Sequence, residues 1–275
     1  MENRKKVTVL MSEYNTKKEQ LKQAIESILN QTYNNFELII IDDCSNEENI
    51  KLIENYKDDR IKLIRNEKNL GLAASLNKGI ELATTNYIIR MDTDDIAKID
   101  RIEKQVKFAE SNPQYSIISG RANFFDDKGI YYTTTKSGEI YIYDLIKGTP
   151  FIHPTMLINK KHIQEIGGYP LYRRCQDYAM AMNMYANGFK GYIMDDILID
   201  YRMDSDGYKK KKFKYRVLEA KIRFHYYRKL KIGLPQYVYC LKPIVAGLMP
   251  KRLMQLYQKN KFKRNNSKEM ECKQK

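Results

Sequence analysis

The sequence predicts an α/β fold, in which helices flank a mostly parallel central sheet, and two observations support this class. Short runs rich in Val and Ile alternate along the chain with segments whose apolar residues recur at helical spacing. Strands and helices that alternate in this way form βαβ units with right-handed crossovers. The length of 275 residues, of which 43% are apolar, allows one substantial core and a smaller appended part.

The first part of the chain supplies four strand-like runs and three helical patterns. The runs occupy residues 7–11, 37–41, 61–64 and 87–91. The helical patterns between them place apolar residues at Leu21, Ile25 and Ile28, at Ile50, Ile53 and Tyr56, and at Leu72, Leu76, Ile80 and Ala83. We expect each of these helices to join two parallel strands of one sheet.

The middle of the chain has a less regular pattern, and helix-stopping glycines help to divide it. The elements that we expect here are, in chain order, a strand (116–120), a turn-rich excursion (126–150), a short helix (within 159–169, ended by Gly167 and Gly168), a helix (177–187) and a strand (192–199).

The formal charge of +15 is concentrated at one end of the chain. Residues 208–275 contain 21 Lys and Arg against 3 Asp and Glu, whereas residues 1–207 contain 28 against 31. We therefore divide the chain into a slightly acidic body (1–207) and a basic helical tail (208–275). Such asymmetry predicts a polyanionic surface as partner, either an anionic membrane or a nucleic acid.

The apolar content of the tail favours the membrane over the nucleic acid. The stretch 236–257 is rich in apolar residues, but Lys242 and Pro243 interrupt it, and about 20 uninterrupted apolar residues are needed to span a bilayer. We expect the tail to lie on a membrane surface as an amphipathic segment. A nucleic-acid-binding protein is also expected to carry basic and aromatic residues on its folded body, which is slightly acidic here.

Cysteine usage and the N-terminus predict a cytoplasmic protein, which the tail would hold at the inner face of the membrane. The four cysteines, Cys44, Cys175, Cys240 and Cys272, form no C-x-x-C pair, which argues against a zinc cluster and a disulfide framework. A reducing compartment follows from this. The apolar run that follows the basic start is too short for the core of a signal peptide.

Polar clusters follow three of the expected strands. They are "SEYN" (12–15), "DDCS" (42–45) and "DTDD" (92–95). In open parallel sheets, ligands bind beyond the carboxyl ends of the strands, so we expect these clusters to line one crevice. Asp92, Asp94 and Asp95 would repel each other unless a positive charge lay among them, and a divalent metal ion is the simplest candidate.

The crevice predicts a nucleoside diphosphate bound through a metal. Neither a G-x-G-x-x-G nor a P-loop motif follows any strand, which makes dehydrogenase and P-loop functions weak candidates. A tyrosine ring such as that of Tyr14 can stack on a base, and Asp42 or Asp43 can accept a hydrogen bond from a pyrimidine or a ribose hydroxyl. A metal held by Asp94 can neutralise a diphosphate.

Six motifs in order resemble the family 2 glycosyltransferases, inverting enzymes with the GT-A fold. The resemblance runs from about Val7 to Arg202. It rests on "VTVLMSEYN", "AIESILNQTYNNFELIIIDDCS", "NLGLAASLNKGIELA", "MDTDDIAKIDRIEKQ", "HPTMLINKKHIQEIGGY" and "CQDYAMAMNMYANG". It implies transfer of a sugar from a nucleotide-sugar, with UDP-sugar as the expected donor, to a saccharide acceptor. Within the family, it is closest to bacterial enzymes of capsule, exopolysaccharide or lipopolysaccharide assembly, whose acceptors are lipid-linked.

The resemblance also implies the roles of residues on the donor side. Tyr14 is expected to stack on the base, and Asp42 and Asp43 to hold base and ribose. Asn69, in the third motif, is expected to contact the donor. In the fourth motif, Asp92 contacts ribose or diphosphate and contributes to the metal site, Asp94 binds Mn²⁺ or Mg²⁺, and Asp95 supports this site.

On the acceptor side, the resemblance implies that Asp177 is the general base. Gln176 stands where the family usually has glutamate, which puts the acceptor contact of that position in doubt. His153 is a candidate ligand of the metal or the diphosphate.

Each of these candidates also has a structural explanation, and a different function stays open. Asp42 and Asp43 are also typical turn residues at strand ends, Asp177 is a typical helix N-cap, and His153 is compatible with a core histidine. The substitution at Gln176 leaves open a non-catalytic glycan-binding relative.

Overall fold

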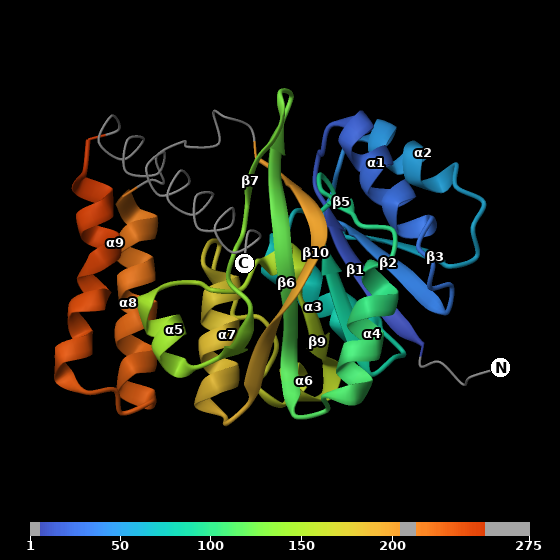
Figure 1. Ribbon diagram of the computed structural model, residues 1–275. Helices are drawn as coiled ribbons and strands as arrows, with labels where there is room; N and C mark the ends of the chain where they lie inside the picture. Colours follow the sequence, from blue (N-terminus) through green and yellow to red (C-terminus); the bar gives the residue numbers. More distant parts are fainter. Residues whose placement is uncertain (1–5, 204–212, 251–275) are drawn as a thin grey trace.

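One sheet runs through the molecule and carries helices on both faces (Figure 1). The computed structural model describes residues 6–203 and 213–250. The strands are β1 (Val7–Glu13), β2 (Phe36–Asp42), β3 (Ile61–Arg65), β4 (Tyr87–Met91), β5 (Ile96–Ala97), β6 (Tyr115–Asp126), β7 (Gly129–Thr133), β8 (Gly138–Ile140), β9 (Leu157–Asn159) and β10 (Lys190–Arg202).

The helices alternate with the strands along the body and continue into the tail. They are α1 (Lys18–Leu29), α2 (Glu47–Glu54), α3 (Leu72–Leu82), α4 (Arg101–Ser111), α5 (Ile142–Lys147), α6 (Lys160–Glu165), α7 (Gln176–Ala186), α8 (Phe213–Lys229) and α9 (Val238–Leu248), with 3₁₀ turns at His153–Thr155 and Leu234–Tyr237.

The central strands run mostly parallel, as the sequence predicts. The strand order is β3-β2-β1-β4-β9-β6-β10-β5, with β7 paired to β6 and β8 to β10. The β3-β2-β1-β4 ladders and the β6-β10 ladder are parallel, whereas β9 is antiparallel to both of its neighbours. The carboxyl ends of β1, β2 and β4 therefore meet at one edge, and this edge carries the three polar clusters.

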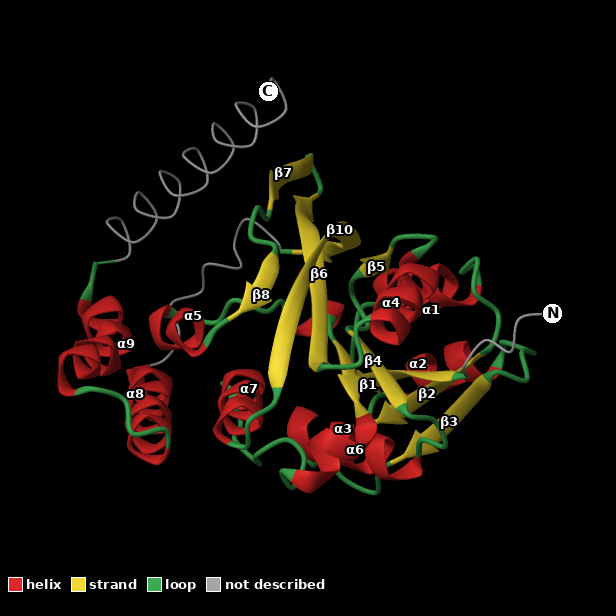
Figure 2. Ribbon diagram, turned by 60° about the horizontal axis from the view of Figure 1, so that its bottom comes forward, coloured by secondary structure: helices red, strands yellow, loops and turns green. Residues whose placement is uncertain are grey.

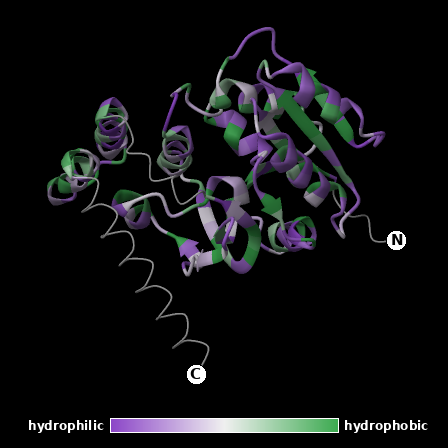
Figure 3. Ribbon diagram, turned by 90° about the horizontal axis from the view of Figure 1, so that it is seen from above, coloured by the Kyte–Doolittle hydropathy of each residue, from purple (hydrophilic) through white to green (hydrophobic). Residues whose placement is uncertain are grey.

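Two hydrophobic clusters fill the space between the sheet and its helices. Alternate residues of β1 enter different clusters, because Leu10 packs on one face while Val9 and Met11 pack on the other. Figure 2 shows α1 and α4 on one face of the sheet and α3 and α6 on the opposite face. In Figure 3 the strands of the first half are mainly hydrophobic, whereas the helices carry both polar and apolar residues.

Most predicted elements are present, and the differences lie in the second half. The four predicted runs are β1 to β4, and the predicted helix over 177–187 is α7 at 176–186. The strands expected at 116–120 and 192–199 are longer than predicted, since β6 and β10 pair along most of their lengths. The excursion 126–150 contains β7, β8 and α5. Helix α4 was not predicted.

The described part of the tail packs against the body. From α8, Ile222, Tyr226 and Tyr227 join the hydrophobic cluster that also contains α7 residues. Tyr227 Oη donates to the carbonyl of Ile146 at 2.8 Å, and Arg223 Nη1 donates to the same oxygen at 2.9 Å. The boundary at 207 and Lys209 to Lys212 lie outside the described residues. Within the described ranges, no helix is long and apolar enough to cross a membrane.

Candidate functional site

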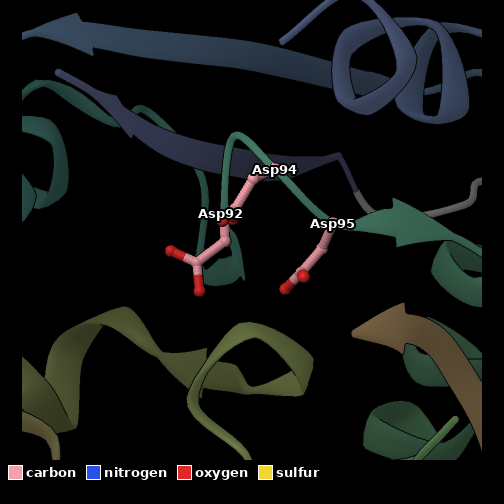
Figure 4. A group of neighbouring side chains, drawn as sticks. All are labelled: Asp92, Asp94 and Asp95. Atoms are coloured by element: carbon pink, nitrogen blue, oxygen red, sulfur yellow. The ribbon is translucent and has the colours of Figure 1, made fainter. Parts of the chain in front are cut away.

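Three carboxylates gather in the loop that follows β4, which we call the acid loop (residues 92–95). One ligand oxygen from each of Asp92, Asp94 and Asp95 lies within 4.8 Å of the others. Figure 4 shows that the side chains of Asp92 and Asp95 extend to the same side of this loop. The sequence prediction that these aspartates lie together is therefore confirmed.

The carboxylates of the acid loop resist joint ionisation. Burial and the charge of Asp92 raise the pKa of Asp94 from 3.8 to about 6. Burial and the charges of Asp92 and Asp94 raise the pKa of Asp95 well above its usual value. Asp95 Oδ1 accepts a hydrogen bond from the Arg202 main chain at 2.8 Å, but its buried Oδ2 has no partner among the described residues.

Two arginines partly compensate the negative charge of the acid loop. Arg90, in β4, is 2% exposed, and its Nη2 forms an ion pair with Asp92 Oδ1. Burial alone would lower the pKa of Arg90, but Asp92 outweighs this cost and raises it. Arg202, at the end of β10, donates from Nε to the carbonyl of Asp94 at 2.9 Å.

This set of atoms fits a hard divalent cation. Mg²⁺ and Mn²⁺ prefer carboxylate oxygens, and the acid loop offers three carboxylates within reach of one point. Among the described residues, the buried Oδ2 of Asp95 accepts no hydrogen bond, so this oxygen is available to a cation. An ion at this position would offset both the burial of these carboxylates and their mutual repulsion, which together raise their pKa values.

Tyr14 directly follows β1, and Asp42 is the last residue of β2 at the same edge of the sheet. Tyr14 has 54% of its surface exposed, so its ring is accessible to a base. Asp42 is fully buried, accepts a hydrogen bond from Ser45 N at 2.9 Å, and pairs with Arg65 Nε at 3.2 Å. Asp42 thus makes the contacts of a strand-end turn residue, and its contact with a nucleotide stays a prediction.

Asp43 links the end of β2 to the start of α3. Its Oδ1 accepts from Leu70 N and its Oδ2 from Gly71 N, both at 2.8 Å. Asn69 Nδ2 donates to the main-chain oxygen of Asp43 at 3.3 Å. Asn69 also lines a cavity of about 260 Å³ between the start of α3 and residues 171–173. The structure thus brings Asp43 and Asn69 together.

His153 lies in the 3₁₀ turn before β9 and contacts Tyr169. His153 Nε2 and Tyr169 Oη are 2.9 Å apart, and the two rings meet edge to face. Burial and the nearby charge of Arg90 lower the pKa of His153 well below its ordinary value, so the imidazole is neutral. The contact is that of a partly buried histidine with an internal partner, and a ligand role for His153 stays a prediction.

Asp177 lies in the first turn of α7, partly buried, directly after Gln176. The N-cap is Cys175, which has a positive φ of 62°, and it makes no capping hydrogen bond through its side chain. The N-cap interpretation of Asp177 is therefore wrong. Burial is the main cause of the raised pKa of Tyr169, and the charges of Asp177 and Asp92 raise it further.

Sequence reasoning missed Arg90, Arg202 and Tyr169. Arg90 could have been found, because a charged residue inside a buried, β-branched strand needs a partner. Arg202 contacts Asp95 and Asp94 across sequence separations of 107 and 108 residues. No local sequence pattern reveals a contact of this range.

Comparison with known families gives one match that covers most of the body. The model described as "Glycosyl transferase family 2" matches residues 8–179. The putative glycosyltransferase EpsE of Bacillus subtilis is 35% identical over 262 residues, which cover 93% of this chain and 94% of EpsE. The UDP-Gal:alpha-D-GlcNAc-diphosphoundecaprenol beta-1,3-galactosyltransferase of Escherichia coli is 31% identical, with 76% of this chain and 78% of that protein covered.

Two solved structures share the fold at low identity. TarS 1–349 of S. aureus in complex with UDP-GlcNAc superposes with a TM-score of 0.64 at 17% identity, covering 90% of this chain and 82% of that one. The mannosyltransferase PcManGT of Pyrobaculum calidifontis, in complex with GDP-Man and Mn²⁺, gives 0.63 at 16% identity, covering 92% and 73%. These likenesses confirm the predicted GT-A architecture.

The raised pKa of Asp94 predicts how stability depends on pH without metal. The folded protein binds the Asp94 proton more tightly than the unfolded chain, so ionisation of this group costs stability as pH rises from about 4 through 6. Asp94→Asn removes this cost. In EDTA, we expect urea unfolding to show the variant more stable by about 1–3 kcal/mol at pH 8, with little difference at pH 4.

Asp59→Asn is the matched control, because Asp59 is exposed. We expect it to change stability by less than about 0.5 kcal/mol at either pH. An Asp94→Asn variant that is less stable than the wild type at pH 8 would contradict the electrostatic account.

Proposed function

Because the chain belongs to glycosyl transferase family 2, we propose that it moves a sugar from a nucleotide-sugar, most simply a UDP-sugar, to a saccharide acceptor in bacterial polysaccharide synthesis. The observation that carries the proposal is the acid loop, which collects three carboxylates at the edge where nucleotides bind in parallel sheets. Relatives named for amylovoran and teichuronic acid biosynthesis support the polysaccharide context.

The donor half of the site divides into a base region and a diphosphate region. Tyr14 is available to stack on the base, and Asp42, Asp43 and Asn69 lie at the neighbouring strand end. Asp94 and Asp92 would hold Mn²⁺ or Mg²⁺, with Asp95 in support. The ion, when bound, stabilises negative charge on the leaving diphosphate. The Mn²⁺ complex of PcManGT supports a metal-dependent reaction.

The acceptor half centres on Asp177. An attacking hydroxyl needs a base that takes its proton as the new bond forms, and the partly buried carboxylate of Asp177 fits this role. Gln176 precedes it and is the candidate for a neutral hydrogen bond to the acceptor. A single in-line displacement, with the base and the leaving diphosphate on opposite faces of the sugar, inverts the anomeric centre.

The acceptor is a lipid-linked saccharide in this proposal, and the tail brings the enzyme to the membrane. The galactosyltransferase relative is named for a diphosphoundecaprenol acceptor. Within residues 213–250, eight basic side chains stand against one acidic side chain. Attraction to anionic lipid contributes about 1 kcal/mol per basic residue near the surface, and salt screens it.

Apolar residues on one face of the tail supply the second contribution. Val238, Leu241, Val245 and Leu248 follow helical spacing along α9, and each has between 58% and 68% of its surface exposed. Next to them, Phe224 lines a groove of about 730 Å³ between α8 and α9. We call these five residues, with Lys221, Arg228 and Lys229 around the groove, the α8–α9 face. Apolar insertion of this face would resist salt.

A screen of nucleotide-sugars tests the central proposal. We expect UDP or a UDP-sugar at 100 times its dissociation constant to stabilise the protein by about 2.7 kcal/mol, and only when Mn²⁺ or Mg²⁺ is present. Asp94→Asn should lose this stabilisation, whereas Asp59→Asn should keep it. Full transfer activity in EDTA would disprove the metal dependence, and salt-sensitive DNA binding without donor hydrolysis would favour the nucleic-acid alternative.

Asp177 should affect turnover and not donor binding. We expect Asp177→Asn to lower turnover of the nucleotide-sugar by a factor of about 10² to 10⁴, with donor affinity little changed, because only the attacking group loses its base. Turnover would be followed by release of the nucleoside diphosphate, and affinity by calorimetry. Normal turnover by this variant would remove Asp177 from the mechanism.

Membrane binding should depend on the α8–α9 face. With vesicles rich in phosphatidylglycerol, we expect high salt to release part of the protein and detergent to release the rest. Leu241→Asp with Val245→Asp should weaken sedimentation at least about tenfold, since each buried aliphatic side chain contributes about 1.5–3 kcal/mol. Leu82→Asp, on an exposed leucine of α3, is the control. Failure of the full-length protein to sediment at low salt would refute membrane binding.

A further inference from the structure

Arg90 is a charged side chain in a strand that is otherwise hydrophobic. All five residues of β4, Tyr87–Met91, are buried. The side chain of Arg90 is only 2% exposed. Burial of a charge in this way is costly unless a partner of opposite sign compensates it. Its Nη2 forms an ion pair with Asp92, the first carboxylate of the acid loop.

The main chain fixes the base of this side chain on both sides. Arg90 N donates to the carbonyl of Met156 at 2.8 Å, and its own carbonyl accepts from Arg101 Nη2 at 2.8 Å. The guanidinium is thus anchored in the sheet, while its Nε and Nη1 have no hydrogen-bond partner among the described residues. The ion pair with Asp92 therefore offsets the cost of burying the charge of Arg90.

The charge of Arg90 reaches the whole acid loop. It lowers the pKa of Asp94 and of Asp95, in each case against a larger effect of burial. Asp92 itself has 30% of its side chain exposed, so the carboxylate that Arg90 holds from below also faces outward. Arg90 therefore holds Asp92 from within the sheet, while part of the carboxylate stays accessible to a ligand.

We propose that Arg90 is a positioning residue of the transfer site, which orients Asp92 before the donor arrives. One oxygen of Asp92 is held by Arg90, and this leaves the exposed part of the carboxylate for the donor. The inference rests on the proposed function, because it assigns Asp92 to the diphosphate side of the donor. Preorganisation of this kind raises affinity by reducing the cost of ordering the site.

Loss of Arg90 should weaken only those contacts that the site makes with the diphosphate part of the ligand. A nucleoside contacts the base region at β1 and β2, whereas a nucleoside diphosphate with Mn²⁺ also needs the acid loop. We expect Arg90→Met to weaken binding of UDP with Mn²⁺ about 10- to 100-fold by calorimetry, and to leave binding of uridine unchanged. Arg90→Lys keeps the charge without the planar fork, so its affinity should be intermediate. If the wild type prefers GDP, then GDP and guanosine are the probes.

A double-mutant cycle separates positioning from a general effect on the fold. Arg90→Met, Asp92→Asn and the double variant are compared for affinity for the diphosphate and for unfolding in EDTA. If Arg90 acts through Asp92, the double variant should bind about as weakly as the weaker single variant, with a coupling of at least about tenfold. In EDTA, adding Asp92→Asn should restore part of the stability that Arg90→Met loses, because the carboxylate that lost its arginine is then neutral.

A remote ion pair provides the matched control. Arg60 Nη2 and Asp58 Oδ2 are 2.7 Å apart, and the side chains are each 25% exposed before β3. Arg60→Met should lower stability without changing affinity for the diphosphate. If Arg90→Met alone fails to fold, then Arg90→Lys and the double variant carry the test.

Two results would overturn the inference on Arg90. Multiplicative effects of Arg90→Met and Asp92→Asn on affinity would show that Arg90 does not act through Asp92. Equal losses for uridine and for UDP with Mn²⁺ would show that Arg90 supports only the fold. A wild type that binds no nucleoside diphosphate in the presence of Mn²⁺ would instead remove the proposed function, and this inference with it.

Discussion

The buried guanidinium of Arg101 holds together the two segments that frame the site. Its Nη2 donates to the carbonyl of Arg90 at 2.8 Å and to that of Pro154 at 2.7 Å, while Nε donates to Gln105 Oε1 at 3.0 Å. It thereby joins the end of strand β4 to the 3₁₀ turn that carries His153. Both carbonyls lie in the interior, where an unpaired acceptor costs about 1–3 kcal/mol. The position of the acid loop thus depends on α4.

The helix that supplies this arginine also shows why part of the fold escaped sequence reasoning. The core-facing side of α4 contains Ile102, Val106 and Ala109, but also the fully buried polar residues Arg101 and Gln105. These two polar residues interrupt the apolar periodicity on which helix recognition depends. In contrast, the helices between β1 and β4 bury apolar residues at regular spacing and were predicted. The small strands β7 and β8 exist because β6 and β10 offer edges to pair with, which is a tertiary effect.

The candidate site shows the same division between local and tertiary information. The acid loop was predictable because its three carboxylates are consecutive neighbours behind a recognisable strand. The internal contacts of Asp42 and Asp43 were compatible with an ordinary turn interpretation as well. Arg202, which bonds to Asp94 and Asp95, comes from a distant segment, so only the folded protein shows this contact. Asp177 was chosen by family resemblance, and the structure adds that it lies in a helical first turn without being the cap.

Contact between α8 and α7 makes the described part of the tail and the body one mechanical unit. The guanidinium of Arg223 lies over the ring of Tyr178, 4.7 Å from its centroid, and Tyr178 directly follows Asp177 in the chain. The tail therefore cannot be exchanged between enzymes like an independent anchor, since its removal would uncover the side of α7 that it covers. Any surface that holds α8 in place also sets the height and tilt of α7 above that surface. The distance of Asp177 from any such surface is then a fixed dimension of the fold.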